Sequence, residues 1–176
     1  NAERINAGME IRREYSVFRD NEWVLLTSPV KVRRGELVRV DIFLSLPGER
    51  SFVVVSDAVP GGLEPVNRNL ATASAVDDAM ADEFKAAPGS WWYSIKDWHS
   101  FNESRWFFYH QELRHDSVRF YSDYLYPGNY HLSYVSQAIA SGEFVTAPVH
   151  AEELYDPDVY GKGLAGILAV TESKEN

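Results

Sequence analysis

Apolar and polar residues alternate along much of the chain, with the two-residue period of strands that bury one face. In residues 37–46 every even-numbered position is apolar, whereas Arg39 and Asp41 stand between them. Because successive side chains of a strand point to opposite faces, this segment is predicted to have one face in a core and the other in water. Residues 9–18 show the same period, although Arg13 interrupts the apolar face.

Several shorter segments carry the same signal or a run of β-branched residues. We predict strands at residues 23–27, 52–55, 105–113, 117–125, 130–138 and 143–146. Residues 31–36 are charged and contain Gly35, which predicts a loop with a turn. In residues 126–129, proline at the second position and glycine at the third fit a type II turn. Beyond residue 148 the chain is predicted to be irregular.

A rigid corner follows the apolar run of residues 52–55. The run has the length and β-branched content of a buried strand. It leads into Pro60, Gly61 and Gly62. Proline removes a donor from the strand ladder, and glycine tolerates positive φ, so the chain is predicted to turn there. Such a corner is an architectural feature and contains no nucleophile or metal ligand.

One stretch departs from the two-residue period. Residues 69–87 are rich in alanine, contain acidic residues and end before a Pro-Gly pair, which predicts a helix. We expect residues 69–102 to form an insertion between strands, ending in an aromatic cluster that contains Trp91, Trp92 and Trp98.

The order of these elements predicts the fold class. About eight short strands without regular strand–helix alternation indicate an all-β, immunoglobulin-like antiparallel β-sandwich with a helical insertion. The 176 residues are expected to form a single domain, 1–176. Within it we expect sandwich strands at 9–68 and 103–163 and a flexible tail at 164–176.

Composition excludes several classes of function. Seventeen basic and 26 acidic residues give a net charge of −9, which opposes binding to nucleic acid or to an anionic membrane. The chain has no cysteine, so disulfide and thiol chemistry are excluded. No apolar run reaches the roughly 18 residues of a membrane span. The chain begins without methionine, and we interpret it as a piece of a longer protein.

The residues that could carry chemistry lack the required spacing. Zinc hydrolases of the HExxH type need two histidines four residues apart on a helix, whereas His110 and His115 are five apart in a segment predicted to be extended. With Glu112 and Asp116 they are interpreted as polar residues at a strand end. No Gly-x-Ser-x-Gly sequence is present. We therefore predict no catalytic residue, no metal and no cofactor.

The tryptophan cluster allows two interpretations. Trp91, Trp92 and Trp98, together with neighbouring aromatic residues, are interpreted first as a small core beneath the insertion. If exposed, they would suit contact with a partner protein, because tryptophan and tyrosine dominate binding hot spots. The alternative is a stacking platform for carbohydrate, which would make the chain a carbohydrate-binding sandwich.

Ordered motifs resemble a known family. They are FVVVSDAVPGGLEPVN (52–67), YHQELRHDSVRF (109–120) with LYPGNYHLSY (125–134), and AEELYDPDVYGK (151–162). The segments are similar to the C-terminal domain of bacterial alpha-2-macroglobulins, large envelope proteins thought to trap proteases. The resemblance extends from about residue 8 to residue 163 and keeps the order of the motifs.

This resemblance implies a macroglobulin-like sandwich without enzymatic activity, acting as one module of a protease-trapping parent. It implies a periplasmic location, with attachment to the inner membrane through the parent left open. The implied partners are sister domains, target proteases reached through the parent, and other envelope proteins. In relatives with a reactive thioester a tyrosine shields that bond, and Tyr155 is the candidate here. The long insertion resembles the branch that lacks the thioester.

The tail motif is the segment in which we expect a contact surface. Tyr155, Asp156, Pro157 and Tyr160 combine rigid aromatic rings with loop backbone. Rigid rings supply contact area at little cost in ordering. We therefore expect these four residues, with Trp91, Trp92 and Trp98 of the insertion, to touch a sister domain or a partner protein.

Overall fold

The structure, a computed structural model, describes residues 3–67, 86–90 and 107–173. Its strands form three sheets. The six-stranded sheet has the order β1 (Ile5–Ala7), β13 (Asp156–Lys162), β12 (His150–Glu153), β6 (Arg50–Ala58), β9 (Ser117–Leu125) and β8 (His110–Leu113). The five-stranded sheet has the order β3 (Glu22–Leu26), β2 (Glu10–Arg19), β5 (Leu37–Leu46), β10 (Gly128–Ala138) and β7 (Leu63–Pro65). The three-stranded sheet has the order β11 (Gly142–Thr146), β14 (Gly166–Thr171) and β4 (Val30–Arg33).

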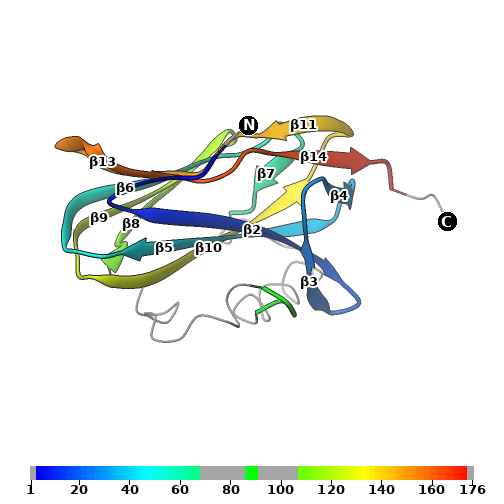
Figure 1. Cartoon of the computed structure of the whole chain (residues 1–176). Helices are drawn as coiled ribbons and strands as arrows, with labels where there is room; N and C mark the ends of the chain where they lie inside the picture. Colours follow the sequence, from blue (N-terminus) through cyan, green and yellow to red (C-terminus); the bar gives the residue numbers. More distant parts are fainter. Residues whose placement is uncertain (1–2, 68–85, 91–106, 174–176) are drawn as a thin grey trace.

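The two larger sheets pack face to face around one hydrophobic core (Figure 1). Val40 and Ile42 of β5 face Val53 and Val55 of β6, and each of these side chains is fully buried. The alternation of residues 37–46 therefore places its apolar face as predicted. The predicted all-β sandwich is confirmed.

The second face of β5 is not in water, which corrects the sequence-based expectation. Arg39 Nε donates a hydrogen bond of 2.8 Å to Asp41, whose other carboxylate oxygen lies 2.7 Å from His131 Nε2. All three side chains are buried. The Arg39 guanidinium lies 4.8 Å from the ring of Trp23, and the His131 ring stacks on Phe43. Charged side chains can be buried when they are paired and hydrogen-bonded, and hydropathy does not register such pairs.

The corner after β6 turns for a different reason from the one predicted. The N–H of Leu63 donates to the carbonyl of Pro60 at 2.9 Å, which closes the turn between β6 and β7. Neither Gly61 nor Gly62 has a positive φ. A Cβ on Gly62 would instead lie 2.6 Å from a ring carbon of Phe144. Glycine is therefore required by close packing, not by backbone conformation.

The connection between β9 and β10 also differs from the expected turn. β9 belongs to the six-stranded sheet and β10 to the five-stranded sheet, so the two strands do not pair with each other. Gly128 has a φ of +148° and already belongs to β10. A type II turn would place this glycine near +80°. The Tyr126–Pro127 link thus carries the chain from one layer of the sandwich to the other.

The C-terminal part of the chain is more regular than predicted. Beyond residue 148, where irregular structure was expected, the chain forms β12, β13 and β14. β14 pairs antiparallel with β11 and parallel with β4. The predicted loop at 31–36 and the predicted flexible tail at 164–176 thus both contain strands. β4 and β14 are short and lie far apart in the sequence, so local patterning could not reveal their pairing.

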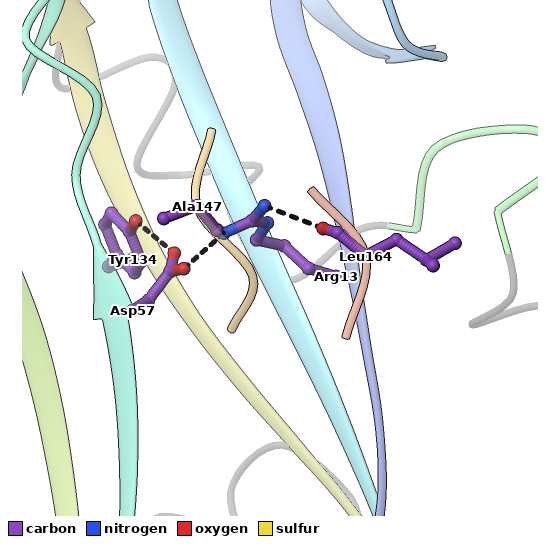
Figure 2. A network of polar contacts seen from close by, with 5 residues as sticks. All are labelled: Arg13, Asp57, Tyr134, Ala147 and Leu164. Atoms are coloured by element: carbon purple, nitrogen blue, oxygen red, sulfur yellow. Dashed lines mark hydrogen bonds and ion pairs between the residues drawn. The ribbon is translucent and has the colours of Figure 1, made fainter. Parts of the chain in front are cut away.

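Arg13, which interrupts the apolar face of β2, joins the two layers (Figure 2). Its guanidinium donates to the Asp57 carboxylate of β6 at 2.5 Å. The hydroxyl of Tyr134 on β10 donates to the other Asp57 oxygen at 2.6 Å. The guanidinium also donates to the carbonyls of Ala147 and Leu164, at 2.7 and 3.4 Å. The network therefore ties both large sheets to the segments that flank β12 and β13.

Burial controls the ionisation of this network. It raises the pKa of the Asp57 carboxyl, an effect opposed by the charge of Arg13 and by donation from Tyr134. Burial alone would lower the pKa of Arg13, but the neighbouring Asp57 carboxylate outweighs it and raises that pKa. The short distance between Arg13 and Asp57 and the bond from Tyr134 are what hold this ion pair within the sandwich.

Most of the predicted insertion lies outside the described residues. This applies to the predicted helix at 69–87, apart from its last two residues, and to residues 91–102. At residues 86–90 the chain makes a turn in which Ser90 N–H donates to the Ala87 carbonyl at 3.0 Å. Ala87 packs in a second small core with Trp23, Leu37 and Val135.

Candidate interaction surface

The hairpin between β12 and β13 has a tight tip at residues 153–156. Glu153 pairs with Asp156, which leaves Leu154 and Tyr155 as the two residues of the turn. The register shifts by three residues next to this pair, because Glu152 pairs with Tyr160. The hairpin lies at one end of the sandwich, in orange at the left of Figure 1. The shift leaves three extra residues on the β13 strand of the hairpin, just behind the tip.

The two turn residues are large and apolar, yet they face solvent. Tyr155 is 82% exposed and Leu154 is 47% exposed. Tight turns usually hold glycine, asparagine, aspartate or proline, each for a conformational reason. Leucine and tyrosine have no such reason to occupy a turn. Neighbouring exposed apolar side chains make this hairpin tip a candidate contact surface.

Phe52 of β6 completes this surface, and sequence analysis missed it. Its ring lies edge-on to the Tyr155 ring, with 5.1 Å between the centroids and 87° between the planes. Its carbonyl accepts a hydrogen bond of 2.9 Å from the N–H of Leu154. We call Phe52, Leu154 and Tyr155 the aromatic knob. The pattern had predicted Phe52 to be part of a buried run, whereas its side chain is 45% exposed.

The other predicted tail residues differ in their surroundings. Asp156 and Pro157 are exposed and extend the surface along β13. Tyr160 is partly buried, stacks on His150 with 5.8 Å between ring centroids, and pairs with Ala7 of β1. The structure therefore places Tyr155, Asp156 and Pro157 together at one end and gives Tyr160 a position within the sheet.

The predicted tryptophan surface cannot be placed. Trp91, Trp92 and Trp98 lie outside the described residues. The small core, the protein contact surface and the carbohydrate platform therefore all remain predictions.

The histidine-containing segment forms an exposed ladder of polar groups on β8. His110 and Glu112 share one face of the strand, with 3.9 Å between His110 Nε2 and the carboxylate. Arg114 lies 3.4 Å from the same carboxyl group. Within residues 3–67, 86–90 and 107–173, no three His, Asp or Glu side chains are grouped so that they could hold a metal ion.

Exposed tyrosines on the outer strands form a second aromatic area that sequence analysis missed. Tyr109 donates to Asp123 at 2.9 Å, and the rings of Tyr124 and Tyr126 meet edge to face at 5.0 Å. Hydrogen bonding to Glu49 raises the pKa of Tyr124 to about 12. Tyr109 precedes β8, Tyr124 belongs to β9 and Tyr126 follows β9. The pairing of β8 with β9 brings Tyr109 to Asp123.

The chain matches a known protein family. A model of the bacterial alpha-2-macroglobulin MG10 domain matches residues 8–158. The chain belongs to this family. The resemblance carried by the three sequence motifs is thereby confirmed, and the sandwich is a macroglobulin domain. Within the described part of the chain, no helix is long and apolar enough to cross a membrane.

Relatives from three bacteria share the domain. An alpha-2-macroglobulin homolog from Nostoc sp. is 24% identical over 171 residues, which are 94% of this chain and 8% of the homolog. Elastase-activated alpha-2-macroglobulin from Escherichia coli matches with a TM-score of 0.72 and 19% identity, over 96% of this chain and 13% of that one. Methylamine-reacted Salmonella alpha-2-macroglobulin matches with a TM-score of 0.65 and 23% identity, over 96% and 10%.

At such low identity the solved structures establish the shared fold. The chain spans only about a tenth of the length of its relatives, between 8% and 13%.

Proposed function

We propose that this macroglobulin domain is a non-catalytic module of a bacterial alpha-2-macroglobulin and docks against a sister domain of the same chain through its aromatic knob. The proposal rests mainly on the exposed Leu154 and Tyr155 at the tip of a tight hairpin. The relatives are some ten times longer than this chain, so neighbouring domains are available as docking partners.

The shape of the knob supports a protein partner. A tyrosine and a leucine presented on a two-residue turn lose little conformational freedom when they are covered. Tyrosine is among the residue types that carry most binding energy at interfaces. The neighbouring Asp156 and Pro157 are exposed and would form a polar rim around the apolar centre.

Hydrogen exchange in the intact parent protein tests the docking. Tyr155→Ala and Leu154→Ala are expected to speed amide exchange at residues 150–162 about tenfold, the effect of losing roughly 1.4 kcal/mol of contact. Because Tyr155 is mostly exposed, its truncation alters the domain itself very little.

A matched control is Val145→Ala, because Val145 is 74% exposed and lies on β11 in another sheet. It should leave exchange at residues 150–162 unchanged. If residues 150–162 exchange no faster in Tyr155→Ala and Leu154→Ala than in the unsubstituted parent protein, the hairpin is not docked and the proposal is wrong.

We also propose, from the family resemblance, that Tyr155 covers the thioester where the parent carries one. Methylamine has been reacted with the Salmonella relative, and a tyrosine-to-glycine mutant of that protein has been solved. In a thioester-bearing parent, the thioester of the Tyr155→Ala variant should react with methylamine several-fold faster than that of the Tyr126→Ala variant. Tyr126→Ala is the control, because it removes an exposed tyrosine elsewhere. Equal rates would show that Tyr155 has no shielding role.

The remaining parts of the proposal concern the parent protein. We propose that it traps proteases, because trypsin and elastase activate the E. coli relative. From the family resemblance we propose that it does so in the periplasm. Sister domains would be the direct partners of this module, and proteases and other envelope proteins would be reached through the parent. Cell fractionation that recovers the parent in the cytoplasm would contradict this location.

A further inference from the structure

We propose that Phe52 is a positioning residue of the docking surface, held in a strained backbone conformation so that it braces Tyr155 for contact with a neighbouring domain. This inference rests on the proposed docking function and assigns a role to a residue outside the hairpin.

The backbone of Phe52 is unusual for its residue type. Its φ is +51°, and the other non-glycine residues with positive φ in the described chain are Asp20 and Asn21. Aspartate and asparagine tolerate the left-handed region, whereas a bulky aromatic residue there is a genuine outlier. Phe52 also lies inside strand β6 and not in a turn.

Two hydrogen bonds between β6 and the β12–β13 hairpin hold this conformation. The Leu154 N–H donates to the Phe52 carbonyl at 2.9 Å. The N–H of Ser51 donates to the side-chain carboxylate of Glu153 at 3.0 Å. One turn residue, Leu154, and the residue before the turn, Glu153, therefore tie Phe52 and its neighbour Ser51 to the hairpin. Strained residues persist when their surroundings over-determine them, and they gather at functional sites.

The strain brings Phe52 to the hairpin tip. Its ring meets Tyr155 edge to face at 5.1 Å, while its side chain remains 45% exposed. The next strand residues, Val53 and Val55, are fully buried and supply the core contacts of β6. Burial in the core therefore does not offset the cost of the strained backbone at Phe52. The strained backbone instead places the Phe52 ring against the exposed Tyr155.

Substitutions at residue 52 in the intact parent protein separate a docking role from a folding role. Asparagine accepts positive φ without the steric cost of phenylalanine but has no ring. Phe52→Asn is therefore expected to speed exchange at residues 150–162 roughly tenfold while leaving exchange of the β9 amides unchanged or slower. Phe52→Tyr keeps the ring and should behave like the natural sequence.

Each result supports or overturns the inference. If Phe52→Asn speeds exchange in β9 as much as in the hairpin, Phe52 serves the fold and the inference is wrong. If Tyr155→Ala speeds hairpin exchange and Phe52→Asn does not, docking stands but the positioning role falls. If neither variant changes hairpin exchange, the proposed docking fails and the inference fails with it.

Discussion

The buried pair of Arg13 and Asp57 provides the sharpest test of how the two layers are held together. Asp57→Asn keeps the shape of the side chain and removes its charge. The side chain of Arg13 is 5% exposed and that of Asp57 is not exposed at all, so water cannot replace the lost partner. The Arg13 guanidinium would then remain charged inside the sandwich.

The expected cost follows from the remaining contacts. Breaking a buried ion pair by removing one partner costs about 3–5 kcal/mol. Arg13 keeps the Ala147 carbonyl at 2.7 Å, and its bond to the Leu164 carbonyl is long at 3.4 Å. We therefore expect about 3 kcal/mol for Asp57→Asn, at the lower end of that range. This is a large part of the 5–15 kcal/mol that stabilises a typical domain.

The reciprocal variant should depend on pH. Arg13→Met leaves the Asp57 carboxylate buried with donation from Tyr134, and burial already raises the pKa of Asp57. The unfolded chain releases this proton at lower pH than the folded variant does. The free energy of unfolding of Arg13→Met should therefore fall further below that of the natural sequence as pH rises from 5 to 8.

Urea denaturation of the 176-residue chain measures these effects, provided that the m-value stays constant. The triple variant Arg13→Met, Asp57→Leu, Tyr134→Phe removes every charge and hydroxyl of the network together. It should recover most of the stability lost in Asp57→Asn, because replacing a whole buried ion pair by apolar residues is often neutral or stabilising. A cost below about 1 kcal/mol for Asp57→Asn, or a triple variant no more stable than the single one, would refute this reasoning.

Two further predictions concern packing and pH. Gly62→Ala should lower the free energy of unfolding by about 1–3 kcal/mol, since its Cβ would lie 2.6 Å from the Phe144 ring, and Phe144→Leu should restore part of the loss. No recovery would show that the ring is not the obstacle. Burial lowers the pKa of His131 below its ordinary 6.5, despite the hydrogen bond to Asp41. Below that pH the unfolded chain therefore binds a proton that the folded chain does not. Urea titrations should show stability falling as pH decreases from 7 to 5, and His131→Gln should flatten this slope; equal slopes would contradict the assignment.

Sequence patterning identified the strands whose periodicity is long. The alternation in residues 37–46 predicted β5 with the bounds that the structure shows and assigned its core face correctly. Patterning failed for β4 and β14, because each is short and is stabilised by pairing across more than 130 residues of chain. It also misjudged the polar face of β5, because Arg39 and Asp41 reveal nothing about the stacking partners that bury them.

The candidate site was only partly predictable. Tyr155 and its neighbours were identified from a motif, which does not reveal how these residues are arranged in space. Phe52 was assigned to a buried run because it precedes three valines. Its positive φ and its contact with Tyr155 arise from hydrogen bonds between β6 and β12, and local residue preferences do not encode such bonds.

The amino-acid sequence by itself determined the class of fold, its family and the absence of thiol chemistry, because periodicity, motif order and composition are local or additive properties. Only the tertiary structure decided which polar residues are buried and where the exposed aromatic residues meet. Those outcomes depend on pairing between strands that are distant in the chain. The pairing of Arg13 with Asp57 and the meeting of Phe52 with Tyr155 are its clearest products.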